Sequence, residues 1–234
     1  MNTIAPAPGI NPLAQWVPSP NFNVRNGDIA FVVLHHTACH TAAQALSTLS
    51  SHNDGGRVST HYLIGRDGQL FQLVAEAHRA WHAGVGHWAG HGDLNSISIG
   101  IELDNDGNEP FSDALVDTLV VLLEDIVARL RIPRRNIIGH ADLAPARKVD
   151  PSVVFPWARL AQHGLGLWPV APVLPAPAGF DPDQALRDIG YDLANRPAAI
   201  AAFHRHFAGH TATELSAADL DLLHNLQSQA KDPA

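Results

Sequence analysis

The chain has 234 residues, with 15 Lys and Arg against 23 Asp and Glu, and its formal net charge is −8 when all histidines are neutral. This acid excess excludes the basic surface with which a general nucleic-acid-binding protein neutralises phosphates, so we expect no nucleic-acid partner. Hydrophobic residues make up 46% of the sequence, which is typical of a globular protein, and no apolar run approaches the ~20 residues of a membrane span. The single cysteine, Cys39, excludes a thiolate zinc cage, so any metal must be held by carboxylates and by some of the 15 histidines.

Apolar runs and turn-forming segments before residue 168 predict a set of strands and helices. In chain order, they are a buried strand at 29–34, a short helix at 42–50, a hairpin of strands 62–64 and 70–74, a strand at 96–103, a helix capped by Ser112 that runs to about Arg131, and a short strand at 136–138. This mixture predicts an α/β fold in which helices pack on one central sheet.

A Pro-rich segment at 168–179, WPVAPVLPAPAG, predicts a linker between two domains. We therefore expect a larger domain with an N-terminal extension at 1–167 and a small helical domain at 180–234. Helical spacing at 182–189, 197–207 and 216–226 predicts three short helices in the second domain. Because about 55 residues build only a marginal core, we expect this domain to dock on the larger one or to be auxiliary.

Two histidines at the ends of predicted buried strands are candidate metal ligands. His35 follows FVVL, His140 follows IIG, and Asp150 comes ten residues after His140. A His-His-carboxylate set leaves one coordination position for water, which is the arrangement of a catalytic zinc site. A single such His is more often a hydrogen-bonded core residue, so the prediction depends on the set. His36 points to the opposite face of the strand, and we therefore expect His35 to be the ligand.

Two further charged residues are candidates for catalysis. Lys148 is one of only two lysines and precedes Asp150 by two residues, where an ammonium group could stabilise an oxyanion; a surface lysine is the alternative. Glu102 lies in the apolar strand ISIGIEL, where an unpaired carboxylate is costly to bury. It could act as a general base near the metal, or it could form an ion pair with Arg79 or Arg147.

The run from Gly139 to Pro151, GHADLAPARKVDP, with Phe155-Pro156-Trp157 after it, closely resembles the zinc-binding segment of N-acetylmuramoyl-L-alanine amidases of the AmpD/AmiD type. Three further segments agree in the same order: VLHHTA at 33–38, HYLI followed by Asp-Gly within 61–68, and WHAG at 81–84 leading to NSISIGIE at 95–102. The tail is similar, more weakly, to the peptidoglycan-binding domain of AmiD-type enzymes through GYD at 190–192 and AFHRHF at 202–207.

The resemblance implies the fold of peptidoglycan recognition proteins, a mixed central sheet flanked by helices. It also implies one zinc ion per chain and hydrolysis, by a zinc-activated water, of the amide between N-acetylmuramic acid and L-alanine in peptidoglycan or muropeptides. By matching position, the implied zinc ligands are His35, His140 and Asp150, the general base is Glu102, the oxyanion stabiliser is Lys148, and the substrate-binding residues are Trp81, His82 and Asn95.

Two other functions stay open: a non-catalytic peptidoglycan recognition module on the same fold, and a zinc hydrolase that acts on an unrelated amide. The tail favours an enzyme that works on large murein in the cell envelope, periplasmic or secreted, although residues 1–20 show no secretory signal. A cytoplasmic enzyme is the alternative. We expect a monomer that binds peptidoglycan or muropeptide fragments.

Overall fold

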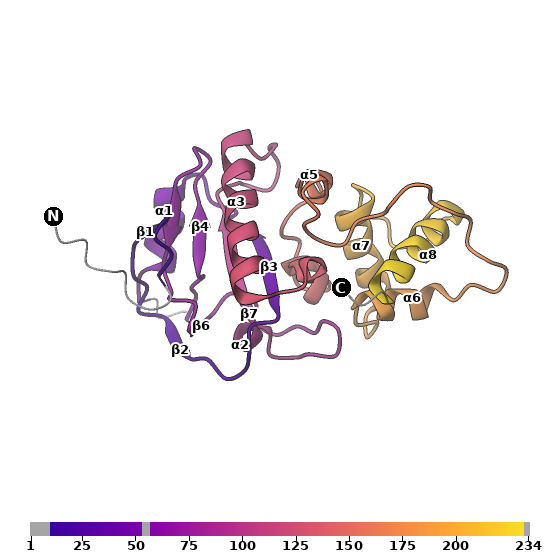
Figure 1. Cartoon of the computed structure of the whole chain (residues 1–234), viewed down its shortest axis with the longest axis horizontal. Helices are drawn as coiled ribbons and strands as arrows, with labels where there is room; N and C mark the ends of the chain where they lie inside the picture. The colour runs from indigo at the N-terminus through magenta and orange to yellow at the C-terminus, as the bar shows by residue number, and fades with distance from the viewer. Residues whose placement is uncertain (1–9, 53–56, 232–234) are drawn as a thin grey trace.

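The computed structural model describes residues 10–52 and 57–231. Six strands form the central sheet in the order β1-β5-β4-β7-β3-β8 (Figure 1). Their bounds are β1 Gln15–Trp16, β3 Phe31–His36, β4 Tyr62–Ile64, β5 Leu70–Gln72, β7 Ser98–Leu103 and β8 Ile137–Gly139. The pairs β4–β7, β7–β3 and β3–β8 are parallel, whereas β4 and β5 form the predicted antiparallel hairpin, so the sheet is mixed. A separate ribbon pairs β2 Phe22–Val24 with β6 His78–Ala80.

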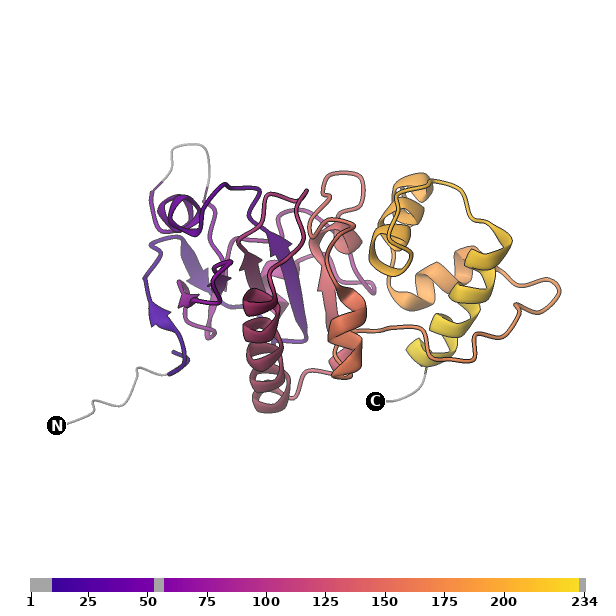
Figure 2. The same cartoon turned by 90° about the horizontal axis from the view of Figure 1, so that it is seen from above.

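Helix α3, Asp113–Leu130, covers one face of this sheet (Figures 1 and 2). The Ser112 side chain accepts a hydrogen bond from Leu115 N and caps the helix as predicted, and the helix ends at Arg131, which has φ 55°. The remaining helices of the larger part are α1 Ala42–Leu49, α2 Leu94–Ile97, the 3₁₀ helix η1 Arg134–Asn136, α4 His140–Leu143 and α5 Trp157–Gln162.

Alternation along two central strands gives the sheet an apolar face and a face that carries polar groups. Val32 and Leu34 of β3 pack in the core under α3, so His35 points to the opposite face. Ile101 of β7 also packs under α3, which places Glu102 on the face of His35. His35 and Glu102 are register partners in the parallel β3–β7 pair, and the two polar residues are therefore lateral neighbours.

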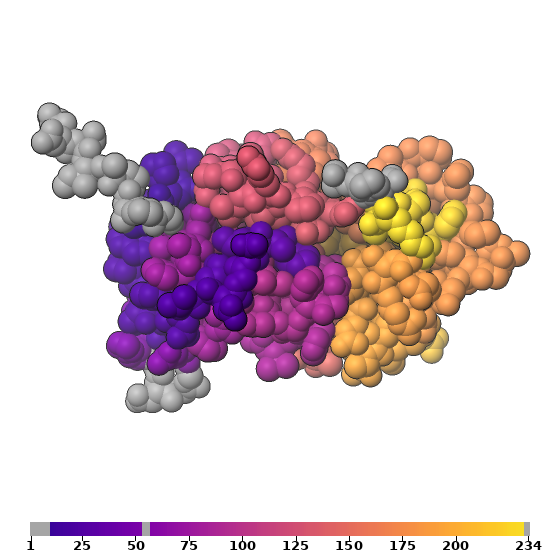
Figure 3. Space-filling view, turned by 60° about the horizontal axis from the view of Figure 1, so that its bottom comes forward, coloured from indigo at the N-terminus to yellow at the C-terminus, as the bar shows by residue number. Residues whose placement is uncertain are grey.

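Three helices follow the Pro-rich segment and form a lobe beside the β8 edge of the sheet (Figures 1 and 3). They are α6 Pro182–Ile189, α7 Arg196–Phe207 and α8 Ala217–Lys231. Leu186 and Phe203 of the lobe share one apolar cluster with Phe31 and Ile138 of the sheet. The lobe is thus docked on the larger part through a continuous core, as its small size predicted.

The structure differs from the sequence prediction at the strand expected at 96–103, and it adds elements that the sequence did not predict: β1, β2, β6, η1, α4 and α5. Residues up to Ile97 form the single turn α2, and the strand begins only at Ser98. The Arg25 guanidinium donates hydrogen bonds to the carbonyl oxygens of Ser96 and Ser98, and the Ser98 hydroxyl donates to Leu94 O, so contacts from a distant segment hold this turn. No helix within residues 10–52 and 57–231 is both long and apolar enough to cross a membrane.

Candidate functional site

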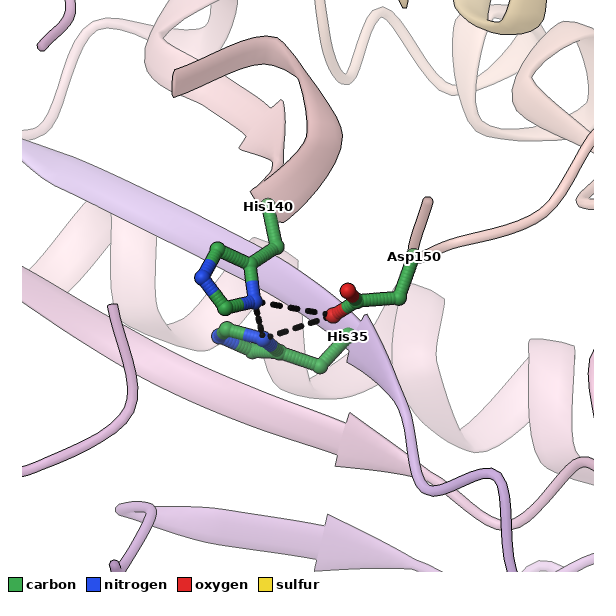
Figure 4. A group of neighbouring side chains, drawn as sticks. All are labelled: His35, His140 and Asp150. Atoms are coloured by element: carbon green, nitrogen blue, oxygen red, sulfur yellow. Dashed lines mark hydrogen bonds and ion pairs between the residues drawn. The ribbon is translucent and has the colours of Figure 1, made fainter. Parts of the chain in front are cut away.

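Three donor atoms from separate segments converge at the end of β3 (Figure 4). His35 Nδ1 and His140 Nδ1 lie 2.9 Å apart, and each lies 3.0 Å from Asp150 Oδ2. A tetrahedral ion bound at about 2.0–2.1 Å separates its ligand atoms by about 3.3 Å. The three atoms therefore already lie close to the positions that such an ion requires.

The backbone brings these residues together through two short connections. Leu34 of β3 is paired with Gly139 of β8, and α4 begins directly after β8, so His140 in its first position lies beside the end of β3. The loop after α4 then folds back, because Ala141 N donates a hydrogen bond of 2.7 Å to the carbonyl oxygen of Asp150.

Outer hydrogen bonds determine which ring nitrogen of each histidine faces the cluster. His140 Nε2 lies 2.9 Å from the carbonyl oxygen of Ala83, which can only accept, so Nε2 carries the proton and Nδ1 presents a lone pair. His35 Nε2 lies 3.1 Å from His82 Nδ1, and donation from His35 to His82 leaves the His35 Nδ1 lone pair on the inner side. Two imidazole lone pairs and one carboxylate oxygen thus meet, and this set fits a bound zinc ion.

His82 continues this chain of hydrogen bonds away from the cluster. Its Nε2 lies 3.3 Å from Ser98 Oγ, and the Ser98 hydroxyl donates to Leu94 O, so each group in the series has one proton to give. His82 is 8% exposed and packs so closely on Gly100 that a Cβ at that position would overlap the imidazole ring. The imidazole of His35 is therefore held by a packed, fully hydrogen-bonded neighbour.

The electrostatics of the three residues suit a divalent cation. Burial and the neighbouring His140 lower the pKa of His35 to about 4, so this imidazole is neutral near pH 7. Burial raises the pKa of Asp150, but the adjacent His140 and His35 outweigh that effect and keep its pKa below the usual range. A neutral imidazole and an ionised carboxylate are the protonation states that metal coordination needs.

Glu102 lies next to the donor cluster and is unpaired. Its Oε2 is buried and has no hydrogen-bond partner in the described part of the chain. Burial and the negative charge of Asp150 raise the pKa of Glu102 to about 8, and the positive charge of Lys148 opposes that rise. A carboxylate that changes protonation near neutral pH, beside a metal-ligand set, is suited to accept and return a proton.

The alternative of an ion pair for Glu102 is wrong. Arg79 is paired with Asp93 at 2.9 Å. Arg147 donates instead to the carbonyl oxygens of Ala83 and Val85, at 2.8 and 2.6 Å. Neither arginine therefore pairs with Glu102, and its carboxyl group stays available for proton transfer at the site.

The three residues expected to bind substrate occupy different environments. Asn95 is 3% exposed, and its Oδ1 accepts hydrogen bonds from the backbone N–H groups of His82 and Ala83, at 2.9 and 2.8 Å. Asn95 thereby holds the backbone segment whose carbonyl oxygen binds His140. Trp81 is partly exposed, with the Arg79 guanidinium 4.1 Å from its ring centroid. The substrate contacts of Trp81, His82 and Asn95 stay a prediction, and in the structure His82 and Asn95 act as buried supports.

Comparison with known proteins agrees with this geometry. Residues 25–153 match the N-acetylmuramoyl-L-alanine amidase family model. The chain belongs to the N-acetylmuramoyl-L-alanine amidase family. Over 160 residues it is 41% identical to the N-acetylmuramoyl-L-alanine amidase AmiD of Escherichia coli K12, a match that covers 61% of this chain and 56% of AmiD. Over 102 residues it is 42% identical to the 1,6-anhydro-N-acetylmuramyl-L-alanine amidase AmpD of Enterobacter cloacae, covering 44% and 54%. The chain thus spans little more than half the length of these curated relatives.

Solved structures of this family are similar over more of the chain. The complex of AmiD from E. coli with the substrate anhydro-N-acetylmuramic acid-L-Ala-D-gamma-Glu-L-Lys gives a TM-score of 0.77 at 34% identity and covers 87% of this chain and 91% of the AmiD chain in that structure. The structure of AmpDh3 from Pseudomonas aeruginosa gives 0.76 at 30% identity, covering 86% and 92%. Residues 1–167 make up a smaller fraction of the chain than the 87% and 86% that these two structures cover. The similarity therefore extends into the C-terminal lobe.

In this amidase-family chain, a carboxylate that the sequence analysis did not single out links α4 to the C-terminal lobe. Asp142 is 2% exposed; its Oδ2 accepts hydrogen bonds from Gly139 N at 2.7 Å and His206 Nδ1 at 2.8 Å, and its Oδ1 accepts one from the Tyr191 hydroxyl at 2.7 Å. The His206 ring stacks on Trp157, with centroids 3.6 Å apart. The one sequence signal for Asp142 is its place three residues after Gly139, which is a capping-box position.

Proposed function

We propose that this member of the amidase family is a zinc-dependent N-acetylmuramoyl-L-alanine amidase that hydrolyses the amide between N-acetylmuramic acid and L-alanine in peptidoglycan or muropeptides. The observation that supports this most strongly is the convergence of three donor atoms, the Nδ1 atoms of His35 and His140 and one carboxylate oxygen of Asp150. Glu102 lies unpaired beside them. The family membership of residues 25–153 supplies the reaction class.

The ion would be held by His35, His140 and Asp150, and zinc at that point supplies Lewis-acid activation of the water and of the amide carbonyl. Glu102 takes a proton from the attacking water and transfers it to the leaving nitrogen of L-alanine. The Lys148 ammonium, two residues from Asp150, stabilises the negative charge that develops on the carbonyl oxygen. The first role requires a carboxylate at position 102, and the second requires a positive charge at position 148.

A non-catalytic recognition module would need neither an activated water nor a proton shuttle. In this chain the complete donor set and the unpaired Glu102 are both in place, and these features support an enzyme over a module that only binds. The AmiD and AmpDh3 structures with muropeptide ligands support peptidoglycan fragments as the substrate class. We expect the protein to act as a monomer. We also expect it in the cell envelope, and fractionation of native cells would test this location.

The experiment that tests this function is digestion of purified muropeptides followed by mass spectrometry. The native chain should release free stem peptide and free sugar, and a chelator should stop the release until zinc is restored. Glu102→Gln should lower kcat by about 100- to 10,000-fold while zinc content stays unchanged. Glu76→Gln is the matched control, because Glu76 is a buried carboxylate paired with Arg129 away from the site. Uncleaved substrate in the presence of zinc-loaded native protein would refute the proposal.

A further inference from the structure

A second group of metal-ligating side chains lies in the C-terminal lobe, away from the site described above. His204 lies near the end of α7, His210 follows that helix, and Asp219 lies in the first turn of α8. One potential ligand atom from each residue lies within 4.8 Å of the other two. We propose that His204, His210 and Asp219 form a second zinc site, separate from the amidase centre.

His204 supplies the strongest argument for a ligand. The residue is completely buried, and its Nδ1 donates a hydrogen bond of 2.7 Å to the carbonyl oxygen of Ala212. This bond places the proton on Nδ1, so Nε2 carries a lone pair in the neutral ring. Nε2 has no hydrogen-bond partner in the described chain, and it lies 3.2 Å from Asp219 Oδ2 without the direction of a hydrogen bond. A lone pair and a carboxylate oxygen at this distance repel each other unless a proton on Nε2 or a metal ion lies between them, and only a metal ion would also bring in His210 as a ligand.

The backbone between the two helices brings the third ligand to the same place. Gly209 has φ 71°, a left-handed conformation that glycine adopts without steric cost, and it turns the chain directly after α7. The His210 ring then returns to His204, with ring centroids 4.2 Å apart. Ala212 contacts both imidazoles, because its N–H also donates to His210 Nδ1 at 3.3 Å. His210 is exposed, so it can exchange this long contact for a bond to the ion.

Asp219 is held in place by its own helix. Its Oδ2 accepts hydrogen bonds of 2.7 Å from the N–H and the hydroxyl of Ser216, which caps α8. Capping explains these two bonds, but it does not explain why a buried imidazole nitrogen without a hydrogen bond lies beside the same carboxylate. Hydrogen bonds to a ligating carboxylate or imidazole are the usual support of a metal site, and both Asp219 and His204 have them.

Two imidazoles and one carboxylate form a donor set that prefers zinc over calcium or magnesium, which take oxygen ligands. An ion bound to residues 204, 210 and 219 would close the connection between α7 and α8. A small helical lobe gains most from such a link, since its own core is marginal. We therefore expect zinc at this second site to stabilise the lobe and to take no part in amide hydrolysis.

The test is zinc stoichiometry on the full-length chain without an affinity tag. After removal of metal by a chelator and equilibrium dialysis against zinc, the native chain should bind about two zinc ions, and His210→Ala should bind about one. His35→Ala should also bind about one, and the double variant none. His210 is exposed and its replacement should leave the fold intact, which circular dichroism checks. His224→Ala, in the same lobe but outside the cluster, is the matched control and should keep both ions.

A second measurement separates a bound ion from a structural role of the side chains. In the His35→Ala background, zinc should raise the midpoint of thermal unfolding, and the rise should disappear when His210→Ala is added. Equal zinc content in the native chain and in His210→Ala, or a zinc-induced rise that survives His210→Ala, would overturn the proposal. Loss of the second ion in His210→Ala with unchanged muropeptide cleavage would support it.

Discussion

The Tyr191 hydroxyl donates a hydrogen bond of 2.7 Å to Asp142, which lies two residues after His140 in the same single-turn helix. Tyr191 belongs to the C-terminal lobe, and its hydroxyl is buried with the carboxylate. The lobe therefore contacts the helix that presents one of the three proposed zinc ligands, and we expect changes in that contact to affect metal affinity.

Tyr191→Phe should lower both stability and zinc affinity at the amidase centre. Loss of a buried hydrogen bond to a carboxylate costs about 1–3 kcal/mol. Freer movement of α4 should weaken zinc binding by roughly 3- to 10-fold, less than the 10- to 100-fold typical of a group that contacts a ligand directly. Urea unfolding and competition with a zinc-binding dye measure the two effects.

The only other tyrosine supplies the control for this variant. Tyr62 donates a hydrogen bond of 2.6 Å to Glu76, and its side chain packs on the α3 face of the sheet. Tyr62→Phe should lower stability by a similar amount and leave zinc affinity unchanged. Equal zinc affinities in the two variants would show that the Tyr191–Asp142 contact supports the fold alone.

Replacement of His82 should weaken zinc binding without changing any ligand. His82→Phe removes the acceptor for His35 Nε2–H and should raise the zinc dissociation constant by about 10- to 100-fold. His82→Gln keeps an acceptor and should recover part of the loss. An unchanged dissociation constant in His82→Phe would contradict the role of His82 in orienting His35.

Lys148→Met should lower kcat by about 100- to 1,000-fold with little change in KM or zinc content, because the ammonium acts on charge that develops only in the transition state. Lys231→Met is the control. Lys231 is the only other lysine, and it pairs at 2.8 Å with Asp188 in the C-terminal lobe. An equal change of kcat in the two variants would contradict the role of Lys148 in stabilising the negative charge on the carbonyl oxygen.

The acid sensitivity of the metal-free fold should depend on His61. This side chain is completely buried, its Nδ1 accepts a hydrogen bond from Gly100 N, and burial with the nearby Arg25 charge lowers its pKa to about 3. The unfolded chain, with a His pKa of about 6.5, binds the proton first. Stability from this group is therefore complete above about pH 6.5 and is lost as the pH falls toward 3.

The test of this pH dependence is urea unfolding of the metal-free chain between pH 7 and pH 4. His61→Gln should be less stable at pH 7 and should lose stability less steeply on acidification, by up to about 1.4 kcal/mol per pH unit. His40→Gln, at an exposed position, should keep the native slope. Parallel slopes for native protein and His61→Gln would show that His61 does not set the acid limit.

The elements that the sequence predicted best are those with a strong local period. Leucines repeat over the whole of α3, and the run before His35 is continuously apolar, so both elements lie close to their predicted positions. The single turns α2 and α4 escaped prediction because they are held by distant groups, the Arg25 side chain in one case and the carbonyl oxygen of Asp150 in the other. Local pattern carries no information about such contacts.

The same distinction applies to the site. His35, His140 and Asp150 could be proposed from strand ends and from a family motif, and the structure brings them together. The positions of Asn95 and His82 behind the ligands could not be predicted, because they depend on contacts between segments that are far apart in the sequence. The link from Asp142 to Tyr191 joins residues 49 positions apart, across two parts of the chain that have separate sequence patterns.

The most direct test of the central claim is zinc titration of the metal-free chain with muropeptide cleavage as the readout, using His210→Ala so that only one site can bind the ion. Cleavage between N-acetylmuramic acid and L-alanine should rise from background to a plateau at about one zinc ion per chain. Asp150→Asn in the same background should remain inactive at that concentration. Full cleavage by the metal-free chain, or by Asp150→Asn, would contradict the account.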